Sequence, residues 1–153
     1  MSMKDYCRRE VCTATSEETI REAAKRMAAR GVGSLVVVDG QERPIGMLTD
    51  RDIVMRVLRR RADPDRVLVG AVMQDEPSVV REDTPLDAAI RVMRRDTVRR
   101  MPVVDDAGRL VGIFAVDDAL QLLASELAGV AEAVRAQFPA NTDPHRALAA
   151  HGE

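Results

Sequence analysis

The chain contains few aromatic residues and few cysteines, and each shortage removes a class of function. Its 153 residues include no tryptophan, one tyrosine and two phenylalanines. Proteins that bind single-stranded nucleic acid stack the bases on aromatic rings, so this mode of binding is not expected. The two cysteines, Cys7 and Cys12, are too few for a disulfide framework or a four-cysteine zinc site. This cysteine usage favours a reducing compartment, and we expect a cytoplasmic protein.

Long apolar runs and a strong charge bias are also missing. No stretch approaches the ~18 consecutive apolar residues of a membrane-spanning helix, and the polar start MSMKDYCRREV is unlike a signal peptide. The formal net charge is −2, so the bulk charge does not indicate a nucleic-acid partner. The most basic stretch, residues 56–61, is interpreted as a solvated helix end, with phosphate contacts to RNA or DNA as the alternative.

The sequence contains an internal repeat. A shift of 66 residues aligns the chain with itself without a gap and places MAARGVGSLVVVDGQERPIGMLTDRDI on MRRDTVRRMPVVDDAGRLVGIFAVDDA. The shift superimposes Gly46 on Gly112 and Asp52 on Asp118. Because the match runs through predicted strands, turn and helix, it indicates a duplication.

Each copy has the same predicted order of strand, helix, strand, strand and helix. In the first copy Thr15 and Glu18 form a candidate capping box, and apolar residues recur at helical spacing over 20–27 until Gly31 ends the helix. The runs SLVVV and IGML are predicted strands around the turn DGQERP, and a helix begins near Asp50. The second copy repeats this pattern with the predicted strands MPVV and LVGIFA.

One copy of about fifty residues buries too little surface to be stable alone. The runs VVV and MPVV are unbroken apolar segments, as in strands that are covered on both faces. We therefore expect an α/β (α+β) fold in which two β-α-β-β-α repeats pack together. The predicted division is repeat 1 at 3–60, a linker at 61–69, repeat 2 at 70–127, and a C-terminal helical extension with a mobile tail at 128–153.

The last predicted helix carries an apolar stripe. Its members recur at helical intervals and are Leu120, Leu123, Leu127, Val130 and Val134. Such a stripe packs on its own module or on a partner. After Pro139 the chain is polar and rich in alanine, and mobility is expected there.

The two copies resemble the cystathionine-β-synthase (CBS) domain. The segments GVGSLVVVDGQERPIGMLTDRDI and VRRMPVVDDAGRLVG carry this resemblance, which covers roughly residues 3 to 127. It implies a Bateman-type module, in which tandem repeats pack about a pseudo-twofold axis with two related clefts between them. It also implies an adenosyl ligand in these clefts (AMP, ADP, ATP, S-adenosylmethionine or NADH), association into a homodimer, and control of a partner protein that the sequence does not identify.

Two aspartates and one threonine are candidate ligand-binding residues. Asp52 and Asp118 lie where the resemblance implies a ribose contact, and one carboxylate can accept hydrogen bonds from both neighbouring ribose hydroxyls. Thr49 adds a hydroxyl beside a helix N-terminus, which favours anions, whereas its counterpart in the second copy is Ala115. The structural alternative is that Thr49 only caps the helix.

The remaining candidates follow from the resemblance. It places Arg99 and Arg100 at the phosphate end of the cleft that contains Thr49, and guanidinium groups suit phosphate recognition. Their counterparts in the first copy are a glycine and a serine, which carry no charge. The resemblance also places Thr13 near the adenine, with Val32 and Val98 as apolar contacts to the base. The alternative for the two arginines is a solvated face.

These differences predict one cleft that is equipped for a nucleotide and a second that has lost part of its site. We expect a regulatory adenine-nucleotide sensor that acts on a partner through a ligand-biased conformational change, without a required cofactor or metal. No nucleophile and base are recognisable together in the sequence, so catalysis is not expected. The alternatives are a ligand-free, stress-associated interaction module and, as a third reading, RNA or DNA binding. Membrane association is not expected.

Overall fold

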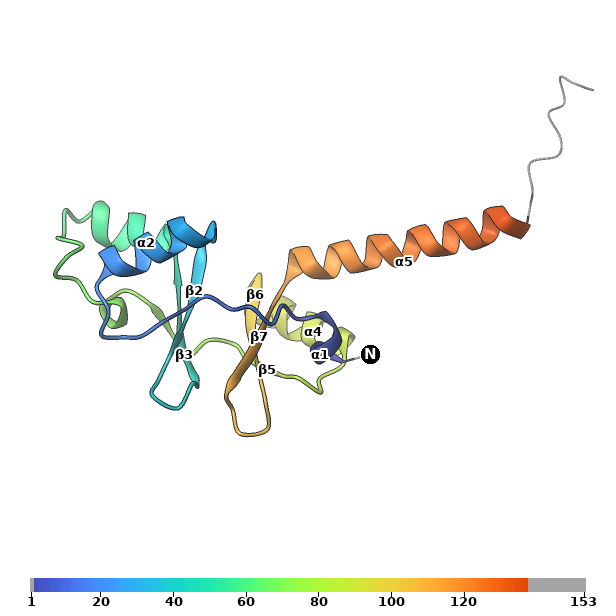
Figure 1. Ribbon diagram of the computed structural model, residues 1–153, viewed down its shortest axis with the longest axis horizontal. Coiled ribbons are helices and arrows are strands. Elements are labelled where there is room, and N and C mark those ends of the chain that lie inside the picture. The colour runs from blue at the N-terminus through green and yellow to red at the C-terminus, as the bar shows by residue number, and fades with distance from the viewer. Residues whose placement is uncertain (1, 138–153) are drawn as a thin grey trace, which may run out of the picture. The chain divides into compact units, whose positions relative to one another are not determined.

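The computed structural model describes residues 2–137. The chain divides into two compact units, Met1–Asp118 and Ala119–Glu153. Within the described residues the first unit contains a four-stranded sheet of order β1-β2-β3-β4 and a three-stranded sheet of order β5-β6-β7 (Figure 1). The predicted mixed α/β class is therefore confirmed.

The first repeat has the predicted order of elements. They are β1 (Thr13–Ala14), α2 (Ile20–Arg30), β2 (Ser34–Val38), β3 (Pro44–Thr49), α3 (Asp50–Ile53) and the π-helix η1 (Val54–Leu58). Strand β2 pairs parallel with β1 and antiparallel with β3, and α2 lies along one face of this sheet (Figure 1). The helix predicted from Asp50 is thus only four residues long before it widens into a π-helix.

The second repeat has the same order. Its elements are β5 (Val80–Arg81), α4 (Leu86–Asp96), β6 (Arg100–Val104), β7 (Leu110–Ala115) and α5 (Val116–Gln137). The duplication extends to irregular backbone: left-handed residues lie 66 positions apart, as Gly31 with Thr97 and Glu42 with Gly108. Gly31 ends α2, as predicted.

The predicted capping box at the start of α2 was wrong by four residues. The helix is capped by Thr19, whose N–H donates to Glu22 Oε2 at 2.9 Å and whose hydroxyl accepts from the Glu22 N–H at 3.3 Å. Thr15 and Glu18 have the same spacing, but the Glu18 carbonyl accepts a hydrogen bond from the Val69 N–H at 2.8 Å. The backbone around Glu18 is therefore paired with another segment and does not start the helix.

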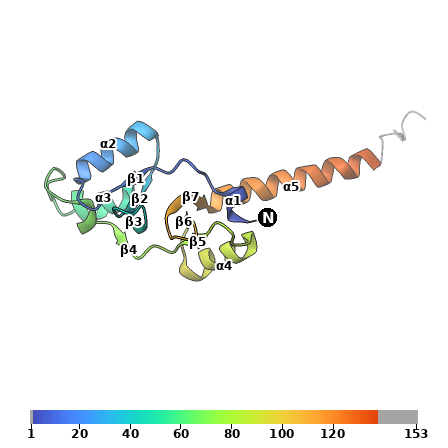
Figure 2. The same ribbon diagram turned by 60° about the horizontal axis from the view of Figure 1, so that its bottom comes forward.

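Each repeat also packs against a short segment that precedes the other repeat in sequence. We call these two segments, residues 3–8 and residues 69–75, the exchanged segments. The remaining elements are α1 (Met3–Tyr6), the 3₁₀ helix η2 (Val69–Ala71) and β4 (Gln74–Asp75). Strand β4 pairs with β3 of the first repeat, whereas α1 contacts β7 of the second and Arg8 pairs with Ile113. The two connections run between the repeats in opposite senses (Figure 2).

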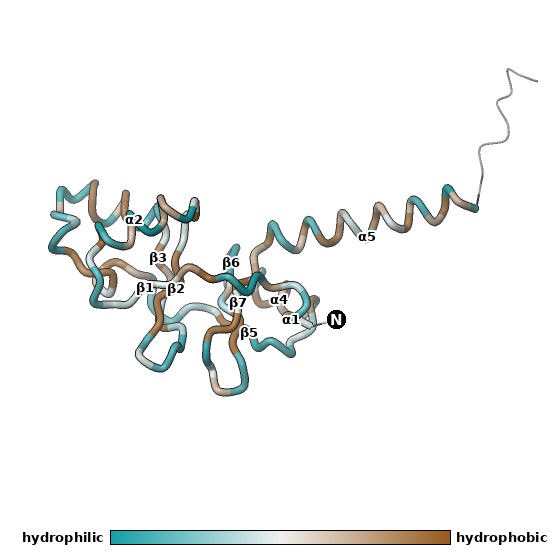
Figure 3. The backbone as a smooth tube through the Cα atoms, viewed as in Figure 1, coloured by the Kyte–Doolittle hydropathy of each residue, from teal (hydrophilic) through white to brown (hydrophobic). Residues whose placement is uncertain are grey.

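These exchanged segments complete the hydrophobic packing of the repeats. Val69 and Val72 are buried in the core of the first repeat, together with Ala14, Ile20, Ala23, Met27, Leu35, Val37, Leu48 and Val57. Met3, the counterpart of Val69, is fully buried, and its N–H donates to the Thr84 carbonyl at 2.9 Å. Apolar residues gather along the strands of both repeats (Figure 3). Residue 69, predicted as the end of the linker, is thus a core residue.

Helix α5 confirms the prediction of a long last helix. It spans 22 residues, and the polar tail predicted after Pro139 lies outside the described residues. No helix within residues 2–137 combines the length and the apolarity that crossing a membrane requires.

The contact between β3 and β4 yields a stability prediction. A Cβ atom on Gly46 would lie 2.5 Å from Met73 Sδ and 3.0 Å from the Gln74 carbonyl oxygen. Gly46→Ala should therefore displace the exchanged segment and destabilise the fold by about 1–3 kcal/mol, which lowers the melting temperature in a circular-dichroism scan by about 3–10 °C. Gly40→Ala is the control, because a Cβ there has no neighbour within 4 Å. Equal melting temperatures for the two variants would contradict this packing.

Candidate functional site

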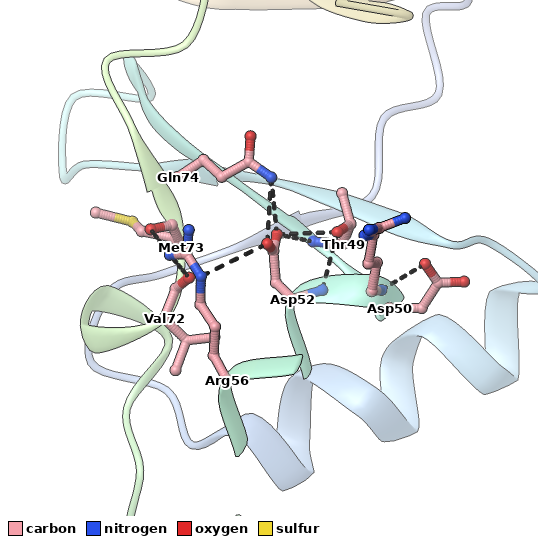
Figure 4. Close-up of polar contacts among 8 residues, drawn as sticks. Thr49, Asp50, Asp52, Arg56, Val72, Met73 and Gln74 are labelled. Atoms are coloured by element: carbon pink, nitrogen blue, oxygen red, sulfur yellow. Dashed lines mark hydrogen bonds and ion pairs between the residues drawn. The ribbon is translucent and has the colours of Figure 1, made fainter. Parts of the chain in front are cut away.

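Thr49 and Asp52 form a capping box where β3 meets α3. The Thr49 N–H and hydroxyl donate to Asp52 Oδ2 at 3.0 and 2.9 Å, and the Asp52 N–H donates to Thr49 Oγ1 at 3.2 Å (Figure 4). The Asp52 side chain is only 8% exposed. The structural role predicted as the alternative for Thr49 is therefore present, and it orients the carboxylate of the predicted ribose contact.

The other partners of Asp52 are Gln74 of the exchanged segment and Arg56 of η1. The Gln74 side-chain amide donates to both carboxylate oxygens at 3.2 Å, and Arg56 Nε lies 3.9 Å from Asp52 Oδ1 (Figure 4). Arg56 also donates to the Val72 carbonyl at 2.8 Å. Sequence reasoning missed Gln74 and assigned Arg56 to a solvated helix end. The 66-residue shift, which superimposes Gln74 on Arg8, was the available signal.

A cleft of about 690 Å³ opens beside this capping box, and we call it the Thr49 cleft. Thr49 lines it together with Arg99 and Arg100 of the second repeat, the two residues that the resemblance assigns to the same cleft. Asp52 does not line the cleft surface. The other lining residues are Gly33, Ser34, Met47, Asp50, Arg51, Gln74, Asp75, Glu76, Pro77, Ser78, Thr97 and Val98.

Opposite charges balance in the Thr49 cleft. Three arginines (Arg51, Arg99 and Arg100) and three acidic residues (Asp50, Asp75 and Glu76) line it. The cleft is thus polar and close to neutral in formal charge, rather than strongly cationic.

Ser78 at the wall of the Thr49 cleft is fixed by a charged neighbour. Its hydroxyl donates to Asp96 Oδ2 at 2.7 Å, and Arg95 Nε donates to Asp96 Oδ1 at 2.6 Å. The Arg95 guanidinium and the Ser78 hydroxyl together lower the pKa of Asp96 to about 2. The Asp96 carboxylate is therefore ionised at neutral pH and holds the Ser78 hydroxyl as a donor.

A second cleft, the Asp118 cleft, has a volume of about 210 Å³. Asp118 Oδ1 accepts from Arg8 Nε at 2.8 Å and lies 2.6 Å from Arg8 Nη2. Asp118 Oδ2 is buried and has no hydrogen-bond partner among the described residues. The physical reason is local, because Ala115 has no hydroxyl where Thr49 supplies one to Asp52. Arg8 takes the place that Gln74 occupies in the other cleft.

The structure separates the predicted residues into groups. Arg100 lines both clefts, while Val32 lies with Asp118 in the second one. Thr13, the predicted adenine contact, lines a third groove along residues 8–15, and its carbonyl accepts from Arg26 at 2.8 Å. Val32 and Thr13 therefore do not line the Thr49 cleft. Val98, the other predicted apolar contact to the base, lines the Thr49 cleft.

Known proteins of one family match the chain. The family model described as "CBS domain" matches twice, over residues 3–59 and 69–125. The uncharacterized protein MK0525 of Methanopyrus kandleri is 37% identical over 122 residues, which are 80% of this chain and 62% of that protein. The CBS domain-containing protein YhcV of Bacillus subtilis is 37% identical over 131 residues, 85% of this chain and 91% of YhcV. The chain also spans 62% of the length of a 17.7 kDa protein of Acidianus ambivalens.

Solved structures show the same fold. The structure of Hypoxic Response Protein I with two coordinated zinc ions matches with a TM-score of 0.72 at 30% identity, over 79% of this chain and 98% of that chain. The CBS domain pair of protein MJ0100 in complex with 5′-methylthioadenosine and S-adenosyl-L-methionine matches with a TM-score of 0.72 at 28% identity, over 82% and 98%. In residues 2–137 of this chain no group of three or more metal-binding side chains is found.

The Thr49 cap leads to a second stability prediction. Thr49→Ala removes the hydroxyl that both donates to and accepts from Asp52, and loss of such a cap costs about 0.5–2 kcal/mol. We expect a lower midpoint in urea unfolding, with an unchanged slope. Thr49→Ser keeps the hydroxyl and should retain most of the stability. If the alanine variant is as stable as the serine variant, the capping box does not support the fold.

Proposed function

Because the chain belongs to the CBS domain family, we propose that its Thr49 cleft binds an adenosyl compound and that this binding regulates a partner protein. The observation that carries the proposal is the meeting of Thr49 with Arg99 and Arg100 in one cleft, although they come from different repeats. The structure of the MJ0100 pair with two adenosyl compounds supports this ligand class.

The sizes of the two clefts favour the Thr49 cleft as the binding site. Small-molecule sites commonly enclose about 300–1,000 Å³. The Thr49 cleft, at about 690 Å³, falls in this range, whereas the Asp118 cleft has about 210 Å³. The smaller cleft also lacks the capping hydroxyl, and the Arg8 guanidinium already occupies one oxygen of Asp118.

Exchange of partners at Asp52 provides a mechanism for regulation. Thr49 holds Oδ2 in place, whereas Oδ1, among residues 2–137, accepts a hydrogen bond only from the Gln74 amide, at 3.2 Å, and lies 3.9 Å from Arg56 Nε. A ribose hydroxyl that binds Oδ1 replaces the Gln74 amide and opens the carboxylate to the cleft. Gln74 belongs to β4, which lies in the segment between the repeats. Ligand binding therefore weakens the attachment of this exchanged segment to the first repeat and shifts the population in which the segment is packed there.

The balanced charge of the Thr49 cleft bears on which adenosyl compound binds. A triphosphate brings several negative charges close to the carboxylates of Asp50, Asp75 and Glu76. Like charges at close range oppose binding. Adenosyl compounds of low net charge, such as AMP or S-adenosylmethionine, are therefore expected to bind more tightly than ATP.

A ligand-free interaction module is the second candidate function. The supporting observation is that Asp52 already has hydrogen-bond partners from its own chain and does not line the cleft. Hypoxic response protein 1 of Mycobacterium tuberculosis, 36% identical over 101 residues, belongs by its name to a stress response. This function predicts no response to any adenosyl compound.

Thermal unfolding against AMP, ADP, ATP, S-adenosylmethionine, 5′-methylthioadenosine and NADH at millimolar concentration tests the proposal. A ligand at about 100 times its dissociation constant stabilises the protein by about 2.7 kcal/mol, which raises the melting temperature by about 5–10 °C. The low-charge compounds should give the larger shifts. If no compound changes the melting temperature, and the denatured protein releases no bound nucleotide, the interaction module is supported instead.

Matched variants locate the binding site. Asp52→Asn removes the carboxylate charge, and loss of a charged hydrogen bond of about 1.5–3 kcal/mol should raise the dissociation constant at least tenfold in calorimetry. Asp118→Asn makes the same change in the other cleft and should alter that constant less than twofold. If Asp118→Asn raised the dissociation constant more than Asp52→Asn, the ligand would bind in the Asp118 cleft.

A further inference from the structure

Arg8 and Gln74 occupy the same position in the two copies of the fold. Gln74 pairs with Met47 of β3 in the first repeat, and Arg8 pairs with Ile113 of β7 in the second. The 66-residue shift superimposes both members of these pairs. Each exchanged segment therefore brings one polar side chain to the aspartate of the repeat on which it packs, an amide in the first repeat and a guanidinium in the second.

The backbone of Arg8 is fixed beside Asp118. The Arg8 N–H donates to the Ile113 carbonyl at 2.9 Å, and the Arg8 carbonyl accepts from the Ile113 N–H at 2.9 Å. From this position the side chain reaches Asp118 Oδ1 with Nε at 2.8 Å and Nη2 at 2.6 Å. The Asp118 side chain is only 11% exposed, so solvent and salt screen this ion pair less than a pair of fully exposed charges.

The two side chains differ in what a ligand has to replace. In the Thr49 cleft, a ribose hydroxyl that binds Asp52 Oδ1 replaces the Gln74 amide, and both donors are neutral (Figure 4). In the Asp118 cleft, the same hydroxyl has to replace a guanidinium, which adds the attraction between opposite charges to its hydrogen bond. Arg8 is therefore the stronger competitor of a ligand hydroxyl.

Arg8 also lies where two hollows adjoin. The Asp118 cleft has about 210 Å³, and the groove along residues 8–15 has about 1090 Å³. The residues that line both hollows are Arg8, Glu10, Val11, Cys12 and Val32. A shorter side chain at residue 8 therefore opens the small Asp118 cleft toward the larger groove.

We infer that residues 8 and 74 determine which cleft binds a ligand, and that Arg8 closes the Asp118 cleft as an internal occupant. The inference rests on the proposed function, because it concerns the same class of adenosyl ligand. It assigns the difference between the clefts to one exchangeable side chain. The missing hydroxyl at Ala115 changes how Asp118 Oδ2 is held, whereas Arg8 decides whether Oδ1 is available.

Isothermal titration calorimetry with AMP tests the inference by exchanging the two side chains. The natural chain should bind one AMP, and Arg8→Gln should bind two, because both aspartates then have a neutral amide as their partner. Gln74→Arg places a guanidinium beside Asp52 and should raise the dissociation constant of the Thr49 cleft at least tenfold. Far-ultraviolet circular dichroism checks that both variants are folded.

Arg9→Gln is the matched control. It removes the same charge from the next residue of the chain, but the Arg9 guanidinium lies 3.6 Å from Glu82 and makes no ion pair with Asp118. This variant should bind one AMP, like the natural chain. If Arg9→Gln also gains a second site, the loss of positive charge in general opens the cleft, and the specific role of Arg8 is overturned.

The combination of Arg8→Gln with Asp52→Asn isolates the Asp118 cleft and should bind one AMP there. If the natural chain and Arg8→Gln each bind one AMP, the inference is overturned and the proposed function stands. If the natural chain binds none and Arg8→Gln binds one, the proposed function fails and the inference stands. Binding by neither protein overturns both. A second site in Ala115→Thr, with Arg8 unchanged, would show that the missing hydroxyl closes the cleft and would also overturn the inference.

Discussion

The buried carboxylate of Asp52 joins the parts of the first repeat on which the candidate site depends. Its Oδ2 atom accepts from the backbone and hydroxyl of Thr49, which fixes the turn from β3 into α3. The Gln74 amide binds the same carboxylate from the exchanged segment. A buried polar group needs such partners, so one side chain connects a helix cap, a strand of the sheet and the segment that leads to the second repeat.

The two clefts differ because a duplicated arrangement has kept different polar groups. In the first, a hydroxyl and a neutral amide bind the aspartate. In the second, Ala115 leaves Asp118 Oδ2 without a partner among the described residues, and the Arg8 guanidinium binds Oδ1. A hydrogen bond from a charged donor is stronger than one from a neutral donor, so Arg8 binds Asp118 more strongly than Gln74 binds Asp52.

Much of the candidate site could be predicted from the sequence, because the repeat aligns functional positions directly. The asymmetry is visible in the aligned sequence, where Thr49 of the first copy corresponds to Ala115 of the second. Arg99 and Arg100 were assigned to the Thr49 cleft through the family resemblance, and they line it. The role of Gln74 was not predicted, since its contact with Asp52 spans the boundary between repeats. Thr13 and Val32 line other grooves than the Thr49 cleft.

The sequence by itself determined the duplication, the order of strands and helices, and the long last helix, because these follow from local periodicity and turn chemistry. Tertiary structure decided between local patterns that are equally good. Thr15 with Glu18 and Thr19 with Glu22 both have capping-box spacing. Only the second pair caps α2, since the backbone at Glu18 is paired with Val69 from the segment before the second repeat. Tertiary structure also decided which residues meet at the Thr49 cleft. These residues lie far apart in the chain, and contacts between distant residues leave no local signal in the sequence.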